Sequence, residues 1–204
     1  MFNFDKLAKR LKNHERNILG HETAVRSAVL IPLVKKNGEW HVLFEVRSQL
    51  LKRQPGEICF PGGKVEKEES DAAAAVRETC EELRIQPAAL EVLGSLDILV
   101  QSPFFFVYPY VGVIEDPAEI DPNEEVEEVF TVPISWLAEQ EPELHYLEMK
   151  IEPDQNFPFD LIPNGENYNW RRQRKPEYFY RYGDYVIWGL TARILVHFLN
   201  LANQ

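Results

Sequence analysis

Alternation of apolar and polar residues predicts a β-hairpin near the start of the chain. Residues 24–34 are rich in β-branched and aliphatic side chains, and residues 40–46 alternate between apolar and polar positions. The turn pair Asn37-Gly38 lies between these two segments. The pattern therefore indicates two antiparallel strands joined by a tight turn.

A strand, a glycine turn and a helix form the central unit of the predicted fold. A short strand over residues 57–60 leads into Pro61-Gly62-Gly63, and a helix follows from about Ser70 to Leu83. At about 100° per residue the helix has two faces. One face holds Ala72, Ala73, Val76, Thr79, Cys80 and Leu83, and the other holds Glu78, Glu81 and Glu82.

The middle of the chain predicts two longer strands and an acidic loop. The strands are expected over Leu90–Val100 and Phe104–Ile114, and Pro109 in the second argues for an edge position or a bulge. An acidic loop over 116–128 precedes a brief strand at 129–132 and a short helix at 134–138.

The last third of the chain contains an insertion and a closing helix. Residues 141–182 are rich in prolines and aromatic residues, and we interpret them as a hairpin-like insertion. A helix is expected over 186–201, because Leu190, Ile194, Leu195 and Phe198 share one face. Strands interleaved with helices predict a mixed α/β sandwich.

An apolar stripe predicts a helix over about residues 3–13. Phe4, Leu7, Ala8 and Leu11 recur at helical spacing among four basic residues. Such a helix could be a transit peptide or lie on a membrane surface. We expect it instead to pack on the protein core, as apolar stripes of this kind usually do.

Composition favours a soluble protein that avoids nucleic acids. The 204 residues suit one domain over 1–204, and the net charge of -11 would repel nucleic-acid phosphates. No apolar run approaches the length that spans a membrane, so we expect no membrane partner. Cys59 and Cys80 form no close-spaced pair, which fits a reducing cytoplasm rather than a zinc or disulfide site.

The acids of the central helix have a spacing that a plain solvated face would not favour. Glu78 and Glu82 are like charges one turn apart, an arrangement that destabilises a helix. One turn before Glu78 the chain has the small residues Ala74 and Ala75, which allow another backbone to approach. Carboxylates sharing a site repel by roughly 4 kcal/mol per pair at about 4 Å, for an effective dielectric near 20. A hard divalent cation, Mg²⁺ or Mn²⁺, would offset this repulsion.

These residues resemble the Nudix box. In that pattern a glycine is followed after five residues by Glu, after seven more by Arg-Glu, and then by a Glu pair; here they are Gly63, Glu69, Arg77, Glu78, Glu81 and Glu82. Arg84 stands where the family usually has glycine, and Thr79 where it often has an aliphatic residue.

The resemblance implies an α/β/α sandwich and a metal-dependent hydrolase of nucleoside diphosphate derivatives. It places the metal at Glu78 and Glu82 beside Gly62, with Glu81 as ligand or base. It gives Arg77 an orienting role and Glu69 a structural one.

A second stretch is similar to the signature upstream of the box in Nudix enzymes that cleave coenzyme A. It comprises Arg47, Ser48, Lys52, Gly56, Phe60 and Gly63, with Lys52 where arginine is usual and Arg53 next to it. This likeness implies coenzyme A as substrate and adenosine 3′,5′-bisphosphate and 4′-phosphopantetheine as products. The 3′-phosphate would need cations, either Arg47, Lys52 and Arg53 or the basic run Arg171, Arg172, Arg174 and Lys175.

Several alternatives stay open on the sequence alone. The general base is Glu81 or one of the loop acids Glu125, Glu127 and Glu128. The substrate could instead be ADP-ribose, NADH or another nucleoside diphosphate derivative. A non-catalytic nucleotide sensor is a second alternative, although no glutamate of the box is missing. The aromatic insertion could support a homodimer.

Overall fold

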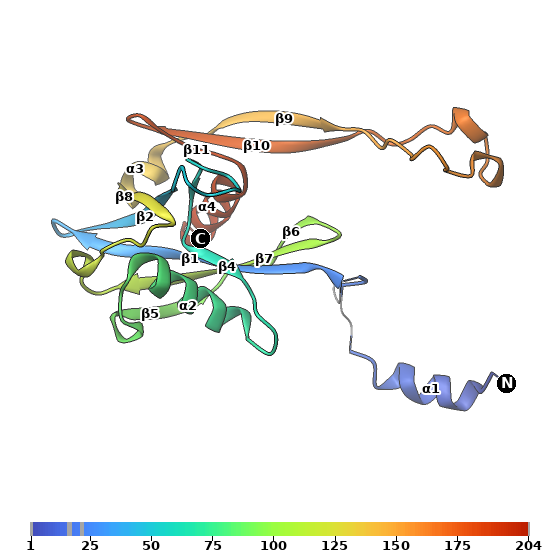
Figure 1. The fold of residues 1–204 in the computed structure, drawn as a ribbon, viewed down its shortest axis with the longest axis horizontal. Helices are drawn as coiled ribbons and strands as arrows, with labels where there is room; N and C mark the ends of the chain where they lie inside the picture. Colours follow the sequence, from blue (N-terminus) through green and yellow to red (C-terminus); the bar gives the residue numbers. More distant parts are fainter. Residues whose placement is uncertain (1, 16–17, 21–22, 204) are drawn as a thin grey trace.

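A mixed β-sheet forms the centre of the computed structural model, which describes residues 2–15, 18–20 and 23–203 (Figure 1). Its strands follow the order β3-β2-β1-β7-β5, with β4 also paired to β1, β6 to β7 and β8 to β2. The strands are β1 (Val25–Lys36), β2 (Glu39–Arg47), β3 (Ile58–Cys59), β4 (Gly62–Lys64), β5 (Leu90–Ser95), β6 (Leu99–Ser102), β7 (Phe105–Ile114) and β8 (Val126–Pro133).

The expected hairpin is present as β1 and β2. The two strands pair antiparallel from Leu33↔Val42 to Lys36↔Glu39. Asn37 and Gly38 form the turn with φ angles of 53° and 86°. Positive φ at both positions matches the twist of the strands, which is why this residue pair is favoured there.

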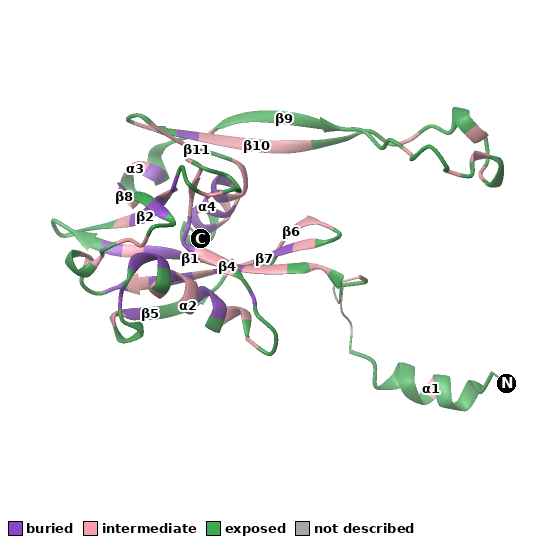
Figure 2. Ribbon diagram, in the orientation of Figure 1, coloured by how far each residue is buried: buried purple, intermediate pink, exposed green. Residues whose placement is uncertain are grey.

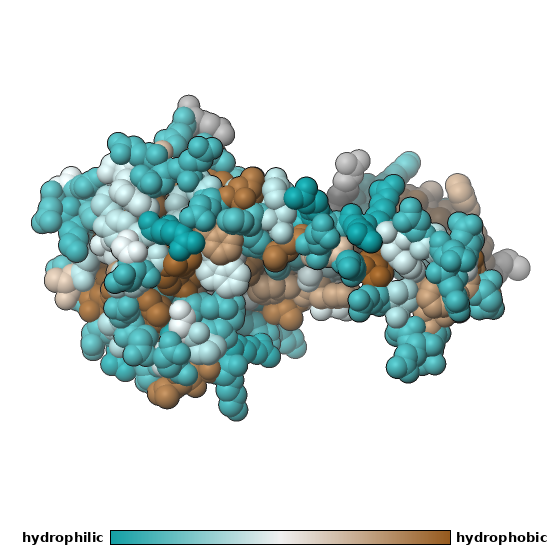
Figure 3. Space-filling view, turned by 90° about the horizontal axis from the view of Figure 1, so that it is seen from above, coloured by the Kyte–Doolittle hydropathy of each residue, from teal (hydrophilic) through white to brown (hydrophobic). Residues whose placement is uncertain are grey.

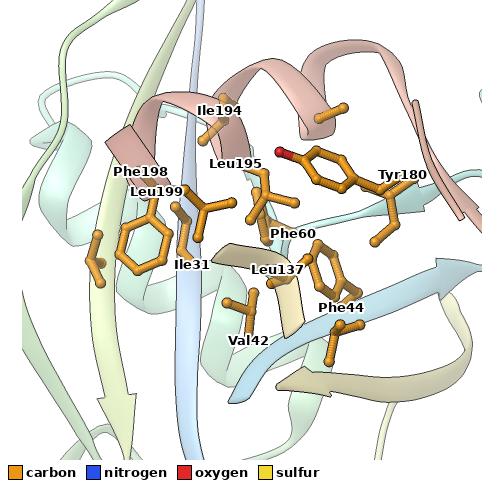
Figure 4. Close-up of a cluster of buried hydrophobic side chains, with 14 of the residues drawn as sticks. Ile31, Val42, Phe44, Phe60, Leu137, Tyr180, Ile194, Leu195, Phe198 and Leu199 are labelled. Carbon is orange, nitrogen blue, oxygen red and sulfur yellow. The ribbon is translucent and has the colours of Figure 1, made fainter. Parts of the chain in front are cut away.

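Helices cover both faces of the main sheet and complete the expected α/β/α sandwich. Helix α2 (Asp71–Leu83) covers one face, while α3 (Ile134–Glu139) and α4 (Gly189–Ala202) pack on the other. Figure 4 shows Leu195 and Phe198 of α4 beside Ile31 of β1. The neighbouring Leu30 faces the α2 side instead, so successive residues of β1 are buried on opposite faces. Short 3₁₀ turns lie at η2 (Pro87–Ala89), η3 (Pro117–Glu119), η4 (Phe159–Leu161) and η5 (Gly165–Asn167).

The insertion forms a second, three-stranded sheet above α4 (Figure 1). Strands β9 (Glu143–Met149) and β10 (Gln173–Tyr182) pair antiparallel, and β11 (Tyr185–Ile187) pairs with the end of β10. The closing helix therefore begins at Gly189 and not at Val186, because residues 185–187 are used as a strand.

Of the two alternatives expected for Pro109, the structure contradicts the edge position, whereas register shifts in the pairing of β7 with β5 and β6 agree with a bulge. Strand β7 pairs in parallel with β1 on one side and with β5 and β6 on the other, so it is not an edge strand. The carbonyl of Pro109 accepts a hydrogen bond from the Leu96 N–H, at 2.8 Å, between the ends of β5 and β6. The single strand expected over 90–100 is thus split into β5 and β6. The split lies opposite Pro109, which has no N–H to donate.

Three other expectations differ from the structure around the central unit. Gly62 and Gly63 belong to strand β4, paired with β1, and do not form a free turn. Strand β8 starts at Val126, so the acidic loop is shorter than expected. The buried side of α2 is rotated, because the helix must bring Glu82 to β4; it consists of Ala74, Ala75, Thr79, Glu82 and Leu83.

Helix α1 (Phe4–Lys12) forms where expected but does not pack on the core. Figures 1 and 2 show it apart from the sheets, and none of its residues is buried. The core clusters on the two faces of the main sheet are filled by α2 on one side and by α3 and α4 on the other. Phe4, Leu7 and Leu11 of the stripe stay 69%, 36% and 62% exposed. No helix within the described ranges is long and apolar enough to cross a lipid bilayer.

Candidate active site

Strand β4 lies so close to its neighbours that both of its glycines are required. A Cβ atom on Gly62 would lie 2.3 Å from the carbonyl oxygen of Ala28, and φ at this residue is 155°. A Cβ atom on Gly63 would lie 2.3 Å from the Glu78 carboxyl carbon. The glycines therefore let helix α2 press its carboxylates against the β4 backbone.

Glu82 is the most deeply buried carboxylate of the helix. The residue is only 4% exposed, and its Oε2 accepts a hydrogen bond from the Gly62 N–H at 2.8 Å. Burial away from water, followed by the nearby charge of Glu45, raises the pKa of Glu82 to about 9. A cation placed beside this carboxylate would lower its pKa and favour the charged form.

Glu45 on β2 is a second buried acid in the site, and the sequence analysis did not identify it. One of its oxygens accepts a hydrogen bond from the Cys59 thiol at 3.2 Å, and the other has no partner among the described residues. Burial raises the pKa of Glu45 to about 7. The available signal was one acid inside the otherwise apolar run 42–46, which is covered on both faces.

Arg77 links three of the predicted carboxylates. It binds Glu69 through two hydrogen bonds of 2.9 and 3.1 Å, and its Nη1 reaches Glu78 at 2.9 Å and Glu81 at 3.2 Å. The Arg77 hydrogen bonds lower the pKa of Glu69, whereas burial raises the pKa of Glu78 despite Arg77. Arg77 thus fixes the outer side of the site, and Glu81 remains exposed there.

The loop acids occupy different positions. The Glu125 carbonyl accepts a hydrogen bond from the Ser48 N–H, next to Arg47, which lines a cavity. Burial is the main cause of the raised pKa of Glu78 and of Glu45, and the charge of Glu125 adds to it. Glu127 is exposed, and Glu128 accepts a hydrogen bond from the Tyr185 hydroxyl at 3.2 Å.

A partly open cavity of about 400 Å³ runs from β4 to the insertion. Arg47, Phe60, Gly62 and Gly63 of the upstream signature line this cavity. The signature residues Ser48 and Gly56 support its wall through backbone hydrogen bonds, from the Ser48 N–H to Glu125 and from the Gly56 N–H to Arg47. Lys52 and Arg53 are exposed and do not line the cavity.

The basic residues of the insertion do not share one surface, because successive side chains of strand β10 point to opposite faces. Lys175 lines the cavity, whereas Arg174 stacks over the Tyr146 ring, with its guanidinium carbon 4.2 Å from the ring centre. Arg171 and Arg172 are exposed and lie outside the cavity lining.

The carboxylates fit a divalent cation, although no group of three potential ligands already converges within the described part of the chain. Glu78 and Glu82 flank the β4 backbone, and the unpaired oxygen of Glu45 lies near them. The pKa values of all three acids are raised mainly by burial, even though Arg77 pairs with Glu78 and the charge of Arg47 acts on Glu45 and Glu82. Oxygen donors of this kind suit Mg²⁺ or Mn²⁺.

Comparison with known proteins gives a family match over more than half of the chain. The model of the NUDIX domain family matches residues 24–155. Peroxisomal coenzyme A diphosphatase NUDT7 of Mus musculus is 34% identical over 155 residues, which cover 75% of this chain and 65% of the mouse protein. The uncharacterized Nudix hydrolase NudL of Photorhabdus laumondii is 32% identical over 92% of this chain and 85% of its own length.

A solved structure supports the fold. A MutT/nudix family protein from Enterococcus faecalis superposes with a TM-score of 0.51, at 15% identity, over all of this chain and 71% of the other. At this identity the likeness extends to the architecture alone.

Proposed function

Because this chain belongs to the Nudix hydrolase family, we propose that it hydrolyses the diphosphate bond of coenzyme A or its derivatives. The products would be 4′-phosphopantetheine and adenosine 3′,5′-bisphosphate. The observation that carries the proposal is the cavity wall, in which Arg47 and Phe60 of the upstream signature meet the glycines of the box. The mouse relative named as a coenzyme A diphosphatase supports the same substrate.

Nudix hydrolases use divalent metal ions, and the buried acids of this chain would hold Mg²⁺ or Mn²⁺. We assign Glu78 and Glu82 as the main ligands, with Glu81 and the backbone at Gly62 beside them. When bound, the metal neutralises negative charge on the diphosphate.

The protein's own groups would orient the substrate and accept a proton. Arg77 holds Glu69, Glu78 and Glu81 in fixed relative positions. Either Glu81 or Glu125 would take the proton of the water that attacks phosphorus, with Glu127 as the more distant candidate. Arg47 would offer its guanidinium to the phosphate oxygens from the cavity wall.

A comparison of substrates tests this proposal. Purified protein is assayed with coenzyme A, ADP-ribose and NADH, each with Mg²⁺ and with Mn²⁺. We expect the highest kcat/KM for coenzyme A. A clear preference for ADP-ribose or NADH would assign the chain to another Nudix activity, and no turnover of any substrate would favour a nucleotide sensor.

We propose that the protein works in the cytoplasm. Cys59 and Cys80 are free thiols, which suits a reducing compartment. The mouse relative is named as peroxisomal, so fluorescence microscopy of the tagged full chain is the appropriate test.

We also propose a homodimer formed through the insertion. Leu144, Tyr146, Leu147 and Met149 of β9 are all exposed by at least 45%. Figure 3 shows hydrophobic side chains interspersed with hydrophilic ones on the face of the molecule that includes this hairpin. Light scattering measures the mass, and aspartate substitutions at Leu144 and Tyr146 should shift it from dimer to monomer.

A further inference from the structure

The insertion contributes an ion pair to the far end of the cavity. Lys175 and Glu177 are two residues apart on β10, so both point to the same face of the strand. Both line the cavity that also contains Gly62 and Gly63, together with Leu147 from β9. Arg47 and Lys175 are the two cationic residues among the described residues of its lining.

Glu177 fixes the position of Lys175. The Lys175 Nζ lies 2.6 Å from Glu177 Oε1, and the two side chains are 18% and 4% exposed. The second oxygen of Glu177 is buried and has no hydrogen-bond partner among the described residues. If the Lys175 ammonium moved away, the buried Glu177 carboxylate would be left unpaired, which is energetically costly. The ion pair therefore holds the ammonium at the cavity wall.

We propose that Lys175 binds phosphate oxygens of the substrate and that Glu177 is its positioning residue. The proposal rests on the function proposed above and assigns the insertion a part in choosing the substrate. The ammonium group has three N–H donors, and the ion pair with Glu177 is the one polar contact of this group found among the described residues. Its remaining donors are available to an anion in the cavity.

A lysine held by a glutamate is a known arrangement for phosphate binding, since protein kinases pair such a lysine with both a glutamate and nucleotide phosphates. In coenzyme A the oxygens could belong to the 3′-phosphate or to the diphosphate itself. Dephospho-coenzyme A distinguishes these two sources, because it has the diphosphate but lacks the 3′-phosphate.

The test compares a double variant with a matched control. Lys175→Met with Glu177→Gln removes both charges, so it keeps the net charge and leaves no buried ion unpaired. Lys36→Met removes a cation from an exposed position at the end of β1, outside the cavity lining. Thermal unfolding verifies that each variant is folded, and Glu177→Gln alone tests positioning while keeping the lysine.

Hydrolysis of coenzyme A and dephospho-coenzyme A gives the first readout. We expect kcat/KM of the double variant to fall about 10- to 100-fold, mainly through KM, with Lys36→Met unchanged. A fall for coenzyme A alone identifies the 3′-phosphate, and an equal fall for both identifies the diphosphate. Glu177→Gln should cause a smaller fall for the same substrates.

Binding provides a readout that does not depend on hydrolysis. Calorimetric titration with adenosine 3′,5′-bisphosphate should show weaker binding to the double variant than to the wild type. Binding and kcat/KM within twofold of the wild type would overturn the role of Lys175. A wild-type protein that binds the bisphosphate through Lys175 but cleaves neither substrate would refute the proposed function alone.

Discussion

Glu82 is the residue on which the proposed metal site depends most. Its carboxylate accepts a hydrogen bond from the Gly62 N–H, while burial and the charge of Glu45 disfavour its charged form. A divalent cation beside Glu82, Glu78 and Glu45 would favour the charged form that burial disfavours. This is the role that we propose for Glu82.

Replacement of Glu82 by Gln tests this role. The amide oxygen can still accept from the Gly62 N–H, so the fold should survive, but the negative charge is lost. We expect kcat for coenzyme A with Mg²⁺ to fall by about 10²- to 10³-fold. Glu91→Gln, an exposed site on β5, is the matched control. Turnover within twofold of the wild type would remove Glu82 from the metal site.

Replacement of Gly63 by Ala tests the close approach of β4 and α2. The new Cβ would overlap the Glu78 carboxyl group, which Arg77 holds at 2.9 Å. A ligand displaced by about 1 Å can lower the rate by roughly 10²-fold. Gly94→Ala serves as control, since its Cβ would meet no atom within 4 Å. Equal activity of the two variants, measured as kcat, would contradict the geometry.

Helix α2 carries most of the carboxylates of the candidate site. The contacts of its first turn are separate from those of the later turns, which carry Glu78, Glu81 and Glu82. Ser70 caps the helix by accepting a hydrogen bond from the Ala73 N–H at 3.1 Å. Asp71 accepts hydrogen bonds from Tyr110 of β7 and Arg26 of β1. The glutamates that face β4 begin two turns later, so the cap should affect stability without affecting chemistry.

Replacement of Ser70 by Ala tests this separation. Loss of the cap should lower the free energy of unfolding by about 1 kcal/mol, measured in urea, with kcat unchanged. Ser95→Ala, at an exposed position of β5, should change neither quantity. A tenfold loss of kcat in Ser70→Ala would mean that the whole helix shifts when its first turn frays.

Elements determined by local chemistry were predictable from the sequence. The β1–β2 hairpin depends on Asn37-Gly38, and α2 on its cap and spacing, all of which lie within a few residues. Other features depend on distant partners. The split between β5 and β6 depends on Pro109, and the rotation of α2 depends on β4, so neither could be deduced from its own segment.

At the scale of the whole molecule, two layers meet at the cavity. The main sheet supplies Arg47, Gly62 and Gly63, and the insertion supplies Lys175 and Glu177. The box residues were predictable because their spacing lies within a single segment. Glu45 and Glu177 were not, because their burial results from strands that are far apart in the sequence.

Buried acids should make the metal-free protein sensitive to pH. Glu82 and Glu45 have pKa values of about 9 and about 7, above their ordinary value of 4.5. Between pH 4.5 and 9 the folded state therefore holds protons that the unfolded chain has lost, so stability falls as pH rises. Unfolding temperature in EDTA should drop from pH 6 to 9, and less steeply in Glu82→Gln. A rise over this range would contradict the raised pKa values.

Identification of the products formed from coenzyme A tests most directly that these acids and a divalent ion split a diphosphate bond. Purified protein is incubated with coenzyme A and Mg²⁺ or Mn²⁺, and the products are identified by mass spectrometry. We predict equal amounts of 4′-phosphopantetheine and adenosine 3′,5′-bisphosphate, and neither product in EDTA. Intact coenzyme A, or its conversion to dephospho-coenzyme A and free phosphate, would contradict the proposed reaction.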